Sequence, residues 1–355
     1  MNIKKLKKTI KNRHNYFFRF FSELPLVFKI LKQKSYFSEQ KRKSKWIQFI
    51  DNISWLIKNN EANKFYHLYG LDVVGAKSES FMDYWHFMNS RNRLNKMNTI
   101  KTQAILLRDK YLFYQYMSSH QLPVPEVFAF MQDGELKNKT LKGIDFSSLK
   151  DKINYFIKEI DGECASFVKR IKDYDSFCEI KNSISKGTFI FQKELTQSPE
   201  MNKLNPGAVN TLRIVTVNNN NHIEVLSALL RIGTKATGNV DNWAKGGIAI
   251  GIEKNGFLKS EGFYKPPFGT KTSTHPDTNI VFEKFQIPCY QEALNLACTA
   301  HKAFYGIHSI GWDIALTTDG IMIIEGNDNW EISLMQACDR GLRQEWLKQG
   351  KFKAN

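Results

Sequence analysis

Apolar residues follow two different periods along this chain. A period of three to four predicts helices at Lys45–Asn59, Asp109–His120, Gln291–Tyr305 and Glu331–Lys348. Alternation and β-branched enrichment predict strands, which are Glu126–Met131, Ala165–Lys169, Thr188–Leu195, Thr211–Val217, His222–Arg231, Gly246–Ile252, Ile310–Leu316 and Ile321–Glu325. Because helices and hairpin-forming strands are interspersed, the predicted fold class is α+β.

The first hundred residues differ from the rest of the chain. No glycine occurs before Gly70, and helical spacing dominates, so residues 1–100 are predicted to form a largely helical region. We expect a boundary near residue 100. The length of 355 residues favours two or three domains or lobes.

The strands Ile310–Leu316 and Ile321–Glu325 read as one hairpin with turn residues at 318–320. A two-residue loop would pair Asp313 with Gly326 and leave Glu325 on the other face. A three-residue loop, with Gly320 in the left-handed position, would pair Asp313 with Glu325. We expect the three-residue loop.

In that register Asp313, Glu325 and Asn327 would share one face, while Met322 and Ile324 would pack behind. Two carboxylates and one amide are hard oxygen ligands that suit Mg²⁺, which keeps other positions for water and phosphate oxygens. The alternative is a surface hairpin with solvated polar residues. Against this, an acid beside an apolar run is costly to bury without a cation or donor.

Cysteine usage and apolar run lengths restrict the class of protein. The cysteines are five in number and widely spaced, at Cys164, Cys178, Cys289, Cys298 and Cys338. This pattern predicts neither a disulfide framework nor a zinc site, and it favours a reducing cytoplasm. No stretch reaches 18 uninterrupted apolar residues, and the N-terminus lacks a secretory signal pattern. We therefore expect a cytoplasmic protein.

The positive charge is concentrated at one end. The whole chain has a formal net charge of +16. Residues 1–50 hold fourteen Lys and Arg against Glu23 and Glu39, a net charge of +12. Aromatic and aliphatic residues are interleaved with these cations, so residues 1–45 are candidates for peripheral contact with an anionic membrane at its inner face. The alternative is a helical lobe whose lysines are solvated. No nucleic-acid motif is present, and no nucleic-acid partner is expected.

An ordered series of motifs resembles the ATP-grasp enzymes. In chain order these motifs are Asp109-Lys110, Phe167-Val168-Lys169, Phe191-Gln192-Lys193-Glu194-Leu195, Asn210-Thr211-Leu212-Arg213, Gly311-Trp312-Asp313 and Ile323-Ile324-Glu325-Gly326-Asn327. Three further segments are similar to the branch called sugar-transfer-associated ATP-grasp, namely Asn205–Arg213, Val240-Asp241-Asn242 with Gly246-Gly247, and His275-Pro276-Asp277-Thr278. The resemblance covers roughly residues 65–345.

The resemblance implies an ATP-grasp fold, in which two α+β lobes hold ATP between them. It places a mobile nucleotide-binding lobe at 101–190 and a metal and catalytic lobe at 191–355. Lys110 and Lys169 would contact phosphates. The segment Gln192, Lys193, Glu194 and Leu195 would be a hinge that meets adenine and ribose.

The same resemblance assigns the catalytic lobe. Asp313, Glu325 and Asn327 would hold Mg²⁺, as two ions, with Mn²⁺ as a substitute. Arg213 would stabilise the γ-phosphate or acylphosphate, and Arg231 is a similar candidate. The remaining catalytic or acceptor-side candidates are Asp241, Asn242 and His275. One departure is that Lys169 is not followed by the glycine-rich loop of the family.

These observations predict an ATP-dependent ligase. It would activate a carboxylate as an acylphosphate and join it to an amine, for example an amino acid to a sugar acid in capsular or O-antigen polysaccharide biosynthesis. A catalytically inactive nucleotide-binding module is the first alternative, motivated by the missing glycines. The second is a membrane-associated assembly factor of a polysaccharide pathway.

Overall fold

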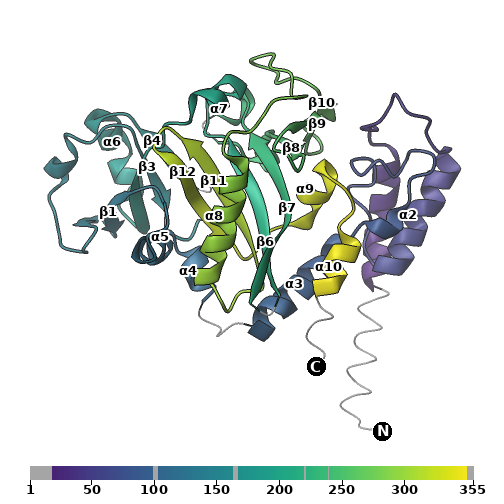
Figure 1. Ribbon diagram of the computed structural model, residues 1–355, viewed down its shortest axis with the longest axis horizontal. Helices are drawn as coiled ribbons and strands as arrows, with labels where there is room; N and C mark the ends of the chain where they lie inside the picture. The colour runs from purple at the N-terminus through teal and green to yellow at the C-terminus, as the bar shows by residue number, and fades with distance from the viewer. Residues whose placement is uncertain (1–17, 99–102, 163–166, 220, 239, 350–355) are drawn as a thin grey trace, which may run out of the picture. The chain divides into compact units, whose positions relative to one another are not determined.

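The computed structural model describes residues 18–98, 103–162, 167–219, 221–238 and 240–349, and the expected region 1–45 is therefore described only from residue 18 (Figure 1). The chain divides into two compact units. One comprises Met1–Arg93, Pro266–Lys271 and Glu331–Asn355, and the other comprises Leu94–Lys265 and Thr272–Trp330. In this division residues 331–349 group with the N-terminal region, and the lobes at 101–190 and 191–355 stay a prediction. The predicted α+β class, with a helical N-terminal region, is confirmed.

The first unit is helical. Its elements are helical residues 18–31, α2 (Lys45–Asn59), η1 (Ser78–Ser80), the start of α3 (Tyr84–Asn98), α9 (Ile332–Cys338) and α10 (Arg343–Gln349). Helix α2 begins where Ser44 Oγ accepts a hydrogen bond from Ile47 N, and it ends at Asn60 in the left-handed conformation. The core of this helical unit contains Val27, Ile30, Leu56, Ala62, Tyr66 and Leu71.

The single C-terminal helix that we expected is two helices. Gln336 Oε1 accepts hydrogen bonds from Met82 N at 2.8 Å and from Leu342 N at 3.1 Å. A Cβ at position 341 would collide with the Ser80 backbone, so only glycine permits this close approach. These contacts explain the break between α9 and α10. Among the described residues, no helix is long and apolar enough to cross a bilayer.

The second unit contains two antiparallel sheets. The five-stranded sheet has the order β2-β1-β5-β3-β4. Its strands are β1 (Val127–Gln132), β2 (Glu135–Asn138), β3 (Tyr155–Glu159), β4 (Val168–Ile171) and β5 (Thr188–Lys193). Strand β3 is absent from our sequence prediction. The predicted strand Ala165–Lys169 corresponds to β4, which begins at Val168; residues 165 and 166 lie outside the described residues, and Phe167 is described but precedes the strand.

Both faces of the five-stranded sheet carry packed side chains. One face forms a core with α6 (Tyr174–Lys181), η2 (Phe146–Leu149) and η3 (Asn182–Ile184). On the opposite face, Phe130 and Ile190 pack against Tyr111 of α5 (Lys110–Ser119). Helix α5 follows the short helix α4 (Ile105–Arg108) and begins at the cap Asp109, whose Oδ1 accepts from Tyr111 N and Leu112 N.

The seven-stranded sheet has the order β10-β9-β8-β7-β6-β11-β12. Its strands are β6 (Thr211–Asn219), β7 (His222–Ile232), β8 (Ile248–Ile252), β9 (Leu258–Tyr264), β10 (Lys271–Thr272), β11 (Ser309–Thr317) and β12 (Gly320–Asn327). Other elements of this part are α7 (Pro199–Leu204), η4 (Lys235–Thr237), η5 (Trp243–Lys245) and α8 (Tyr290–Ala303). Alternate residues such as Leu212, Ile214 and Trp312 form a core with α8, so the intervening residues face the other side.

The β11–β12 hairpin has the expected pairing but a different turn. Thr317 pairs with Gly320, which leaves a two-residue loop, so the predicted three-residue loop is wrong. Farther along, Ile314 pairs with Ile323 while Asp313 pairs with Glu325. A β-bulge at Ile324 therefore restores the register that the two-residue turn alone would have lost.

The bulge also decides which residues of β12 pack in the core. Ile323 is buried, whereas Met322 pairs with Ala315 on the other face, so our prediction that Met322 and Ile324 pack behind is wrong. Beyond the bulge, Gly326 turns toward the core. A Cβ there would lie 2.8 Å from Leu107 Cδ2 and 2.9 Å from Trp312 Cζ3.

We predict that Gly326→Ala destabilises the protein. The added methyl meets a packed ring and a leucine, and such overpacking costs about 1–3 kcal/mol. Chemical denaturation should show this loss of unfolding free energy. Gly143→Ala is the matched control, since a Cβ there meets nothing within 4 Å. Equal stability of both variants would contradict the packing account.

Candidate functional site

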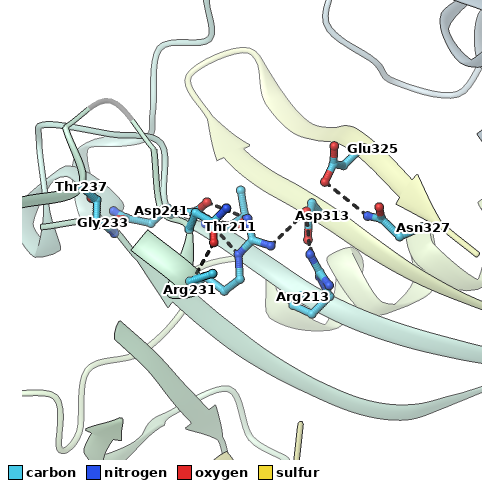
Figure 2. Close-up of polar contacts among 12 residues, drawn as sticks. Thr211, Arg213, Arg231, Gly233, Thr237, Asp241, Asp313, Glu325 and Asn327 are labelled. Carbon is cyan, nitrogen blue, oxygen red and sulfur yellow. Dashed lines mark hydrogen bonds and ion pairs between the residues drawn. The ribbon is translucent and has the colours of Figure 1, made fainter. Parts of the chain in front are cut away.

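A cluster of charged side chains lies on the face of the seven-stranded sheet opposite α8 (Figure 2). Arg213 of β6 and Asp313 of β11 are register partners, so their side chains leave the sheet on the same face. Leu212 and Ile314 on either side point into the core. Strand alternation and the pairing of β6 with β11 therefore create this contact.

Asp313 is held by two guanidinium groups. Arg213 Nε donates to Asp313 Oδ1 at 2.5 Å, and Arg213 Nη2 donates to Oδ2 at 2.9 Å. Arg231 Nη1 donates to Oδ2 at 3.2 Å. Burial alone would raise the pKa of Asp313, but the two arginines outweigh it and hold that pKa well below its ordinary value. Asp313 is therefore an anion in this site.

Arg231 is shared between two acids. Its Nη2 donates to Asp241 Oδ1 at 2.6 Å. Asp241 Oδ2 accepts from Thr211 N at 3.1 Å and also from the Thr211 hydroxyl. Asp241 thus ties its loop to β6 and β7, and it fixes the orientation of the arginine that reaches Asp313.

Glu325 is the second carboxylate of the hairpin. Its pKa is raised, because burial and the neighbouring Asp313 both disfavour the charged form. Asn327 Nδ2 donates to Glu325 Oε1 at 3.3 Å, as Figure 2 shows. Two close carboxylates and an amide oxygen are a donor set that fits a hard cation such as Mg²⁺. Within the described part of the chain, no group of three or more His, Cys, Asp or Glu is arranged to hold a metal.

Two lysines, Lys158 of β3 and Lys110 of α5, interact electrostatically with Glu325. Lys158, at the end of β3, donates from Nζ to Gln192 Oε1 at 2.7 Å. Burial and the neighbouring Lys110 lower the pKa of Lys158 to about 8, and Glu325 opposes this shift. Burial also lowers the pKa of Lys110, and Glu325 again opposes it. These ammonium groups lie where an anion would be stabilised.

The start of α5 brings these lysines together. Lys110 N donates to Ile160 O at 3.0 Å, just beyond β3. Lys110 Nζ donates to Gly162 O at 2.7 Å. Gly162 lies four residues after Lys158, so a glycine does follow the lysine that faces Glu325.

Lys169 lies on the other face of the five-stranded sheet. Its register partner is Ile157, whose side chain is in the core with α6, whereas Lys158 alternates to the opposite face. Lys169 is exposed. The predicted phosphate contact of Lys169 stays a prediction, and sequence reasoning did not name Lys158. The signal was available, because Lys158 ends the apolar run 155–157 and precedes the turn residues Asp161-Gly162.

The predicted hinge, residues 192–195, begins at the end of β5, where Gln192 accepts the hydrogen bond from Lys158. Gln192 is buried and its Nε2 donates to Pro125 O at 3.4 Å. Lys193 is exposed and pairs with Asp319 at 3.5 Å. Glu194 accepts from Arg170 Nε at 3.0 Å. Leu195 is half-buried in the connection that follows.

The last two predicted site residues, His275 and Asn242, form hydrogen bonds that stabilise loops. His275 is fully buried; its Nδ1 accepts from Asp277 N at 3.3 Å, so its Nε2 donates to Gly233 O at 2.9 Å. Asn242 caps η5, where its Oδ1 accepts from Ala244 N at 2.8 Å. Neither side chain joins the charged cluster around Asp313 in the contacts of the described residues, whereas Asp241 does.

Comparison of the sequence with models of known protein families finds a match to one family. The model of the family described as "Sugar-transfer associated ATP-grasp" matches residues 178–351. A search of curated proteins finds no match.

Several solved structures are similar to this one. Carboxyaminoimidazole ribonucleotide synthase from Aspergillus clavatus, complexed with ATP, is 13% identical with a TM-score of 0.39, over 64% of this chain and 46% of that chain. The ATP-grasp ligase PsnB, complexed with minimal precursor, Mg and ADP, is 14% identical with a TM-score of 0.41, over 72% of this chain and 62% of that chain. A RimK domain ATP-grasp protein from Sphaerobacter thermophilus is 12% identical with a TM-score of 0.39, over 70% and 67%. The chain thus spans less than half the length of the synthase.

We predict that the ammonium group of Lys158 titrates near pH 8 in the folded protein. Its folded pKa lies below the ordinary lysine value of about 10.4. Between these two pH values the unfolded chain binds more protons at this residue, so its contribution to the unfolding free energy rises with pH. NMR of labelled lysine side chains measures the midpoint.

Glu325→Gln should lower that midpoint further, because the carboxylate favours the charged lysine. The control is Asp319→Asn, at the exposed tip of the same hairpin, which should leave it unchanged. A midpoint above pH 10, or no response to Glu325→Gln, would contradict the proximity of Lys158 to this carboxylate.

Proposed function

Because residues 178–351 belong to the sugar-transfer-associated ATP-grasp family, we propose that this protein is an ATP- and Mg²⁺-dependent ligase. Family membership by itself suggests an ATP-dependent ligase. We further propose that the enzyme activates a carboxylate as an acylphosphate and joins it to an amine. The observation that carries this proposal is the electrostatic interaction of Lys110 and Lys158 with Glu325, whose register partner Asp313 is bound by two arginines.

In the proposed complex, the polyphosphate lies between the lysines and the hairpin. Lys110 and Lys158 bind phosphate oxygens as compact cations, which relieves the cost of holding two ammonium groups close together. Asp313, Glu325 and Asn327 would hold the metal. Bound there, Mg²⁺ would neutralise charge on the phosphates and polarise them. Two ions, or Mn²⁺ in their place, are part of the same proposal.

The arginines act on the charge that develops during transfer. An oxygen of the substrate carboxylate attacks the γ-phosphorus, the bond to the ADP oxygen breaks, and ADP leaves with that electron pair. The amine then attacks the acyl carbon, phosphate leaves, and the amine proton passes to solvent or phosphate. Arg213 and Arg231, held in place by Asp313 and Asp241, present fixed donors to the transferred group.

The nucleotide base is assigned to the hinge. Residues 192–195 end β5 and begin the connection that leads through α7 to β6, and their backbone would contact adenine, with Glu194 near the ribose. Arg170 already holds the Glu194 carboxylate at 3.0 Å, which supports a fixed orientation. Asp241, Asn242 and His275 are proposed to position the acceptor-side loops rather than to react, which their hydrogen bonds to neighbouring groups support.

The proposed substrates are a saccharide carboxylate and an amine such as an amino acid, in capsular or O-antigen polysaccharide assembly at the cytoplasmic face of the membrane. The family's association with sugar transfer supports this class. The basic composition supports an anionic sugar substrate.

A second candidate function is nucleotide binding without turnover. The engagement of both Asp313 oxygens by arginines favours it, since a metal would have to share this carboxylate. ATP binding without ADP formation, across a panel of sugar acids and amino acids, would select this alternative.

We predict that Lys158→Ala weakens ATP binding, while Lys169→Ala does not. Removing a cation that faces phosphate should raise the dissociation constant by about tenfold or more, since a hydrogen bond to a charged group contributes about 1.5–3 kcal/mol. Calorimetric titration with Mg²⁺ and a non-hydrolysable ATP analogue measures the difference. Equal affinities for the two variants would contradict the assignment of Lys158.

We predict that replacing Asp313 and Glu325 together by alanine abolishes Mg²⁺-dependent ADP release. The hairpin would then lack both anionic ligands of the proposed metal. The measurement is ADP release across the substrate panel, with circular dichroism to confirm folding. Asp319→Ala, on the same hairpin but exposed, is the matched control. ADP release that survives in the double variant would refute the metal assignment.

A further inference from the structure

The helical residues 18–31 carry aromatic side chains on the side away from their core. Phe18, Phe21 and Phe28 are 73%, 65% and 52% exposed. At 100° per residue these positions lie on one face of the helix, whereas Val27 and Ile30 lie on the other and are buried. This helix is therefore apolar on its inner and its outer face.

Helix α2 exposes apolar residues and buries polar ones. Trp46, Ile50 and Ile57 are 68%, 44% and 57% exposed on one face. Gln48 and Asn52, on the opposite face, are buried, and their amides donate to backbone carbonyls of residues 43 and 48. A water-soluble surface helix has the opposite pattern, so the outer face of α2 needs an explanation.

The two outer faces form one surface. The rings of Phe28 and Phe49 are 6.0 Å apart, and those of Trp46 and Phe49 are 5.7 Å apart and stacked. We call this the outer apolar surface, and its members are Phe18, Phe21, Phe28, Trp46, Ile50 and Ile57. Contiguous exposed patches of this kind mark interaction sites.

The charge around the outer apolar surface is of one sign. Lys29, Lys32 and Lys34 are exposed beside it. The acids of this region have cationic or hydrogen-bond partners in the same unit: Glu23 accepts from Ala62 N, Glu39 pairs with Lys271, and Asp51 pairs with Lys43. In addition, the sequence of residues 1–17 contains six Lys and Arg and no acid.

We propose that the outer apolar surface docks the protein on an anionic lipid bilayer. Its phenylalanine, tryptophan and isoleucine side chains enter the region between headgroups and acyl chains, while the lysines contact the anionic headgroups. The two helices lie in the plane of the interface, in keeping with the lack of a spanning helix among the described residues. Uniform positive charge around the patch selects an anionic membrane over a second, equally basic copy of this chain.

Vesicle flotation of the full-length protein tests this proposal. We predict binding to vesicles of phosphatidylcholine with phosphatidylglycerol and much weaker binding to phosphatidylcholine alone. The triple variant Phe21→Gln, Trp46→Gln, Ile50→Gln should bind anionic vesicles at least about tenfold less, because it removes three apolar side chains that would leave water on binding. The substituted side chains are exposed, so folding should be unchanged, which circular dichroism verifies.

The matched control replaces three equally exposed apolar residues elsewhere, Ile153→Gln, Val281→Gln and Tyr305→Gln, and should bind like the unmodified protein. Lys29→Gln with Lys34→Gln should reduce binding to anionic vesicles and its salt dependence. Failure of the unmodified protein to bind anionic vesicles would overturn the proposal. Equal binding by the two triple variants would also overturn it. A third contrary result would be that the unmodified protein does not bind vesicles but self-associates, and that only the first triple variant loses this self-association.

Discussion

The carboxylate of Asp313 is the group on which the charged site depends. Two guanidinium groups approach it from neighbouring strands, and a second carboxylate, Glu325, lies opposite it across the hairpin. The net result is a buried anion that is stabilised only while Arg213 and Arg231 stay in place. Removing Arg213 would leave Asp313 with one guanidinium, and removing Arg231 would weaken the charge compensation of both Asp313 and Asp241, which is why these residues act as one unit.

Both sheets contribute charged groups to the same region. The five-stranded sheet and the start of α5 supply lysines whose pKa values are lowered by burial, and the hairpin of the seven-stranded sheet supplies carboxylates. Glu325 is the carboxylate that links the two sides, because it interacts with both lysines and also lies opposite Asp313 in the hairpin. The outer apolar surface of the N-terminal unit is a separate feature, because it pairs exposed aromatics with cations and its acids have partners of their own.

Local patterns were sufficient for much of the architecture and for most of the charged residues. The α+β class, helix α2 and the strands β6, β7 and β11 follow from the spacing of apolar residues, because burial of one face imposes that spacing. Arg213 and Asp313 could be chosen from sequence, because a charge inside an apolar strand needs a partner. Sequence reasoning failed for β3, where only five residues carry the signal, and it therefore did not consider Lys158.

The sequence alone therefore determined which residue types are available and, for Arg213, Arg231, Asp313 and Glu325, which strand carries them. Tertiary structure decided which groups meet. The bulge at Ile324 sets the pairing of Asp313 with Glu325, and no local rule predicts it, since the two-residue turn by itself predicts the opposite register. Likewise, alternate side chains leave a strand on opposite faces, and the neighbouring elements decide which face becomes the core. Lys169 therefore lies on the same face as Ile157, which packs in the core with α6, and Lys158 lies on the opposite face.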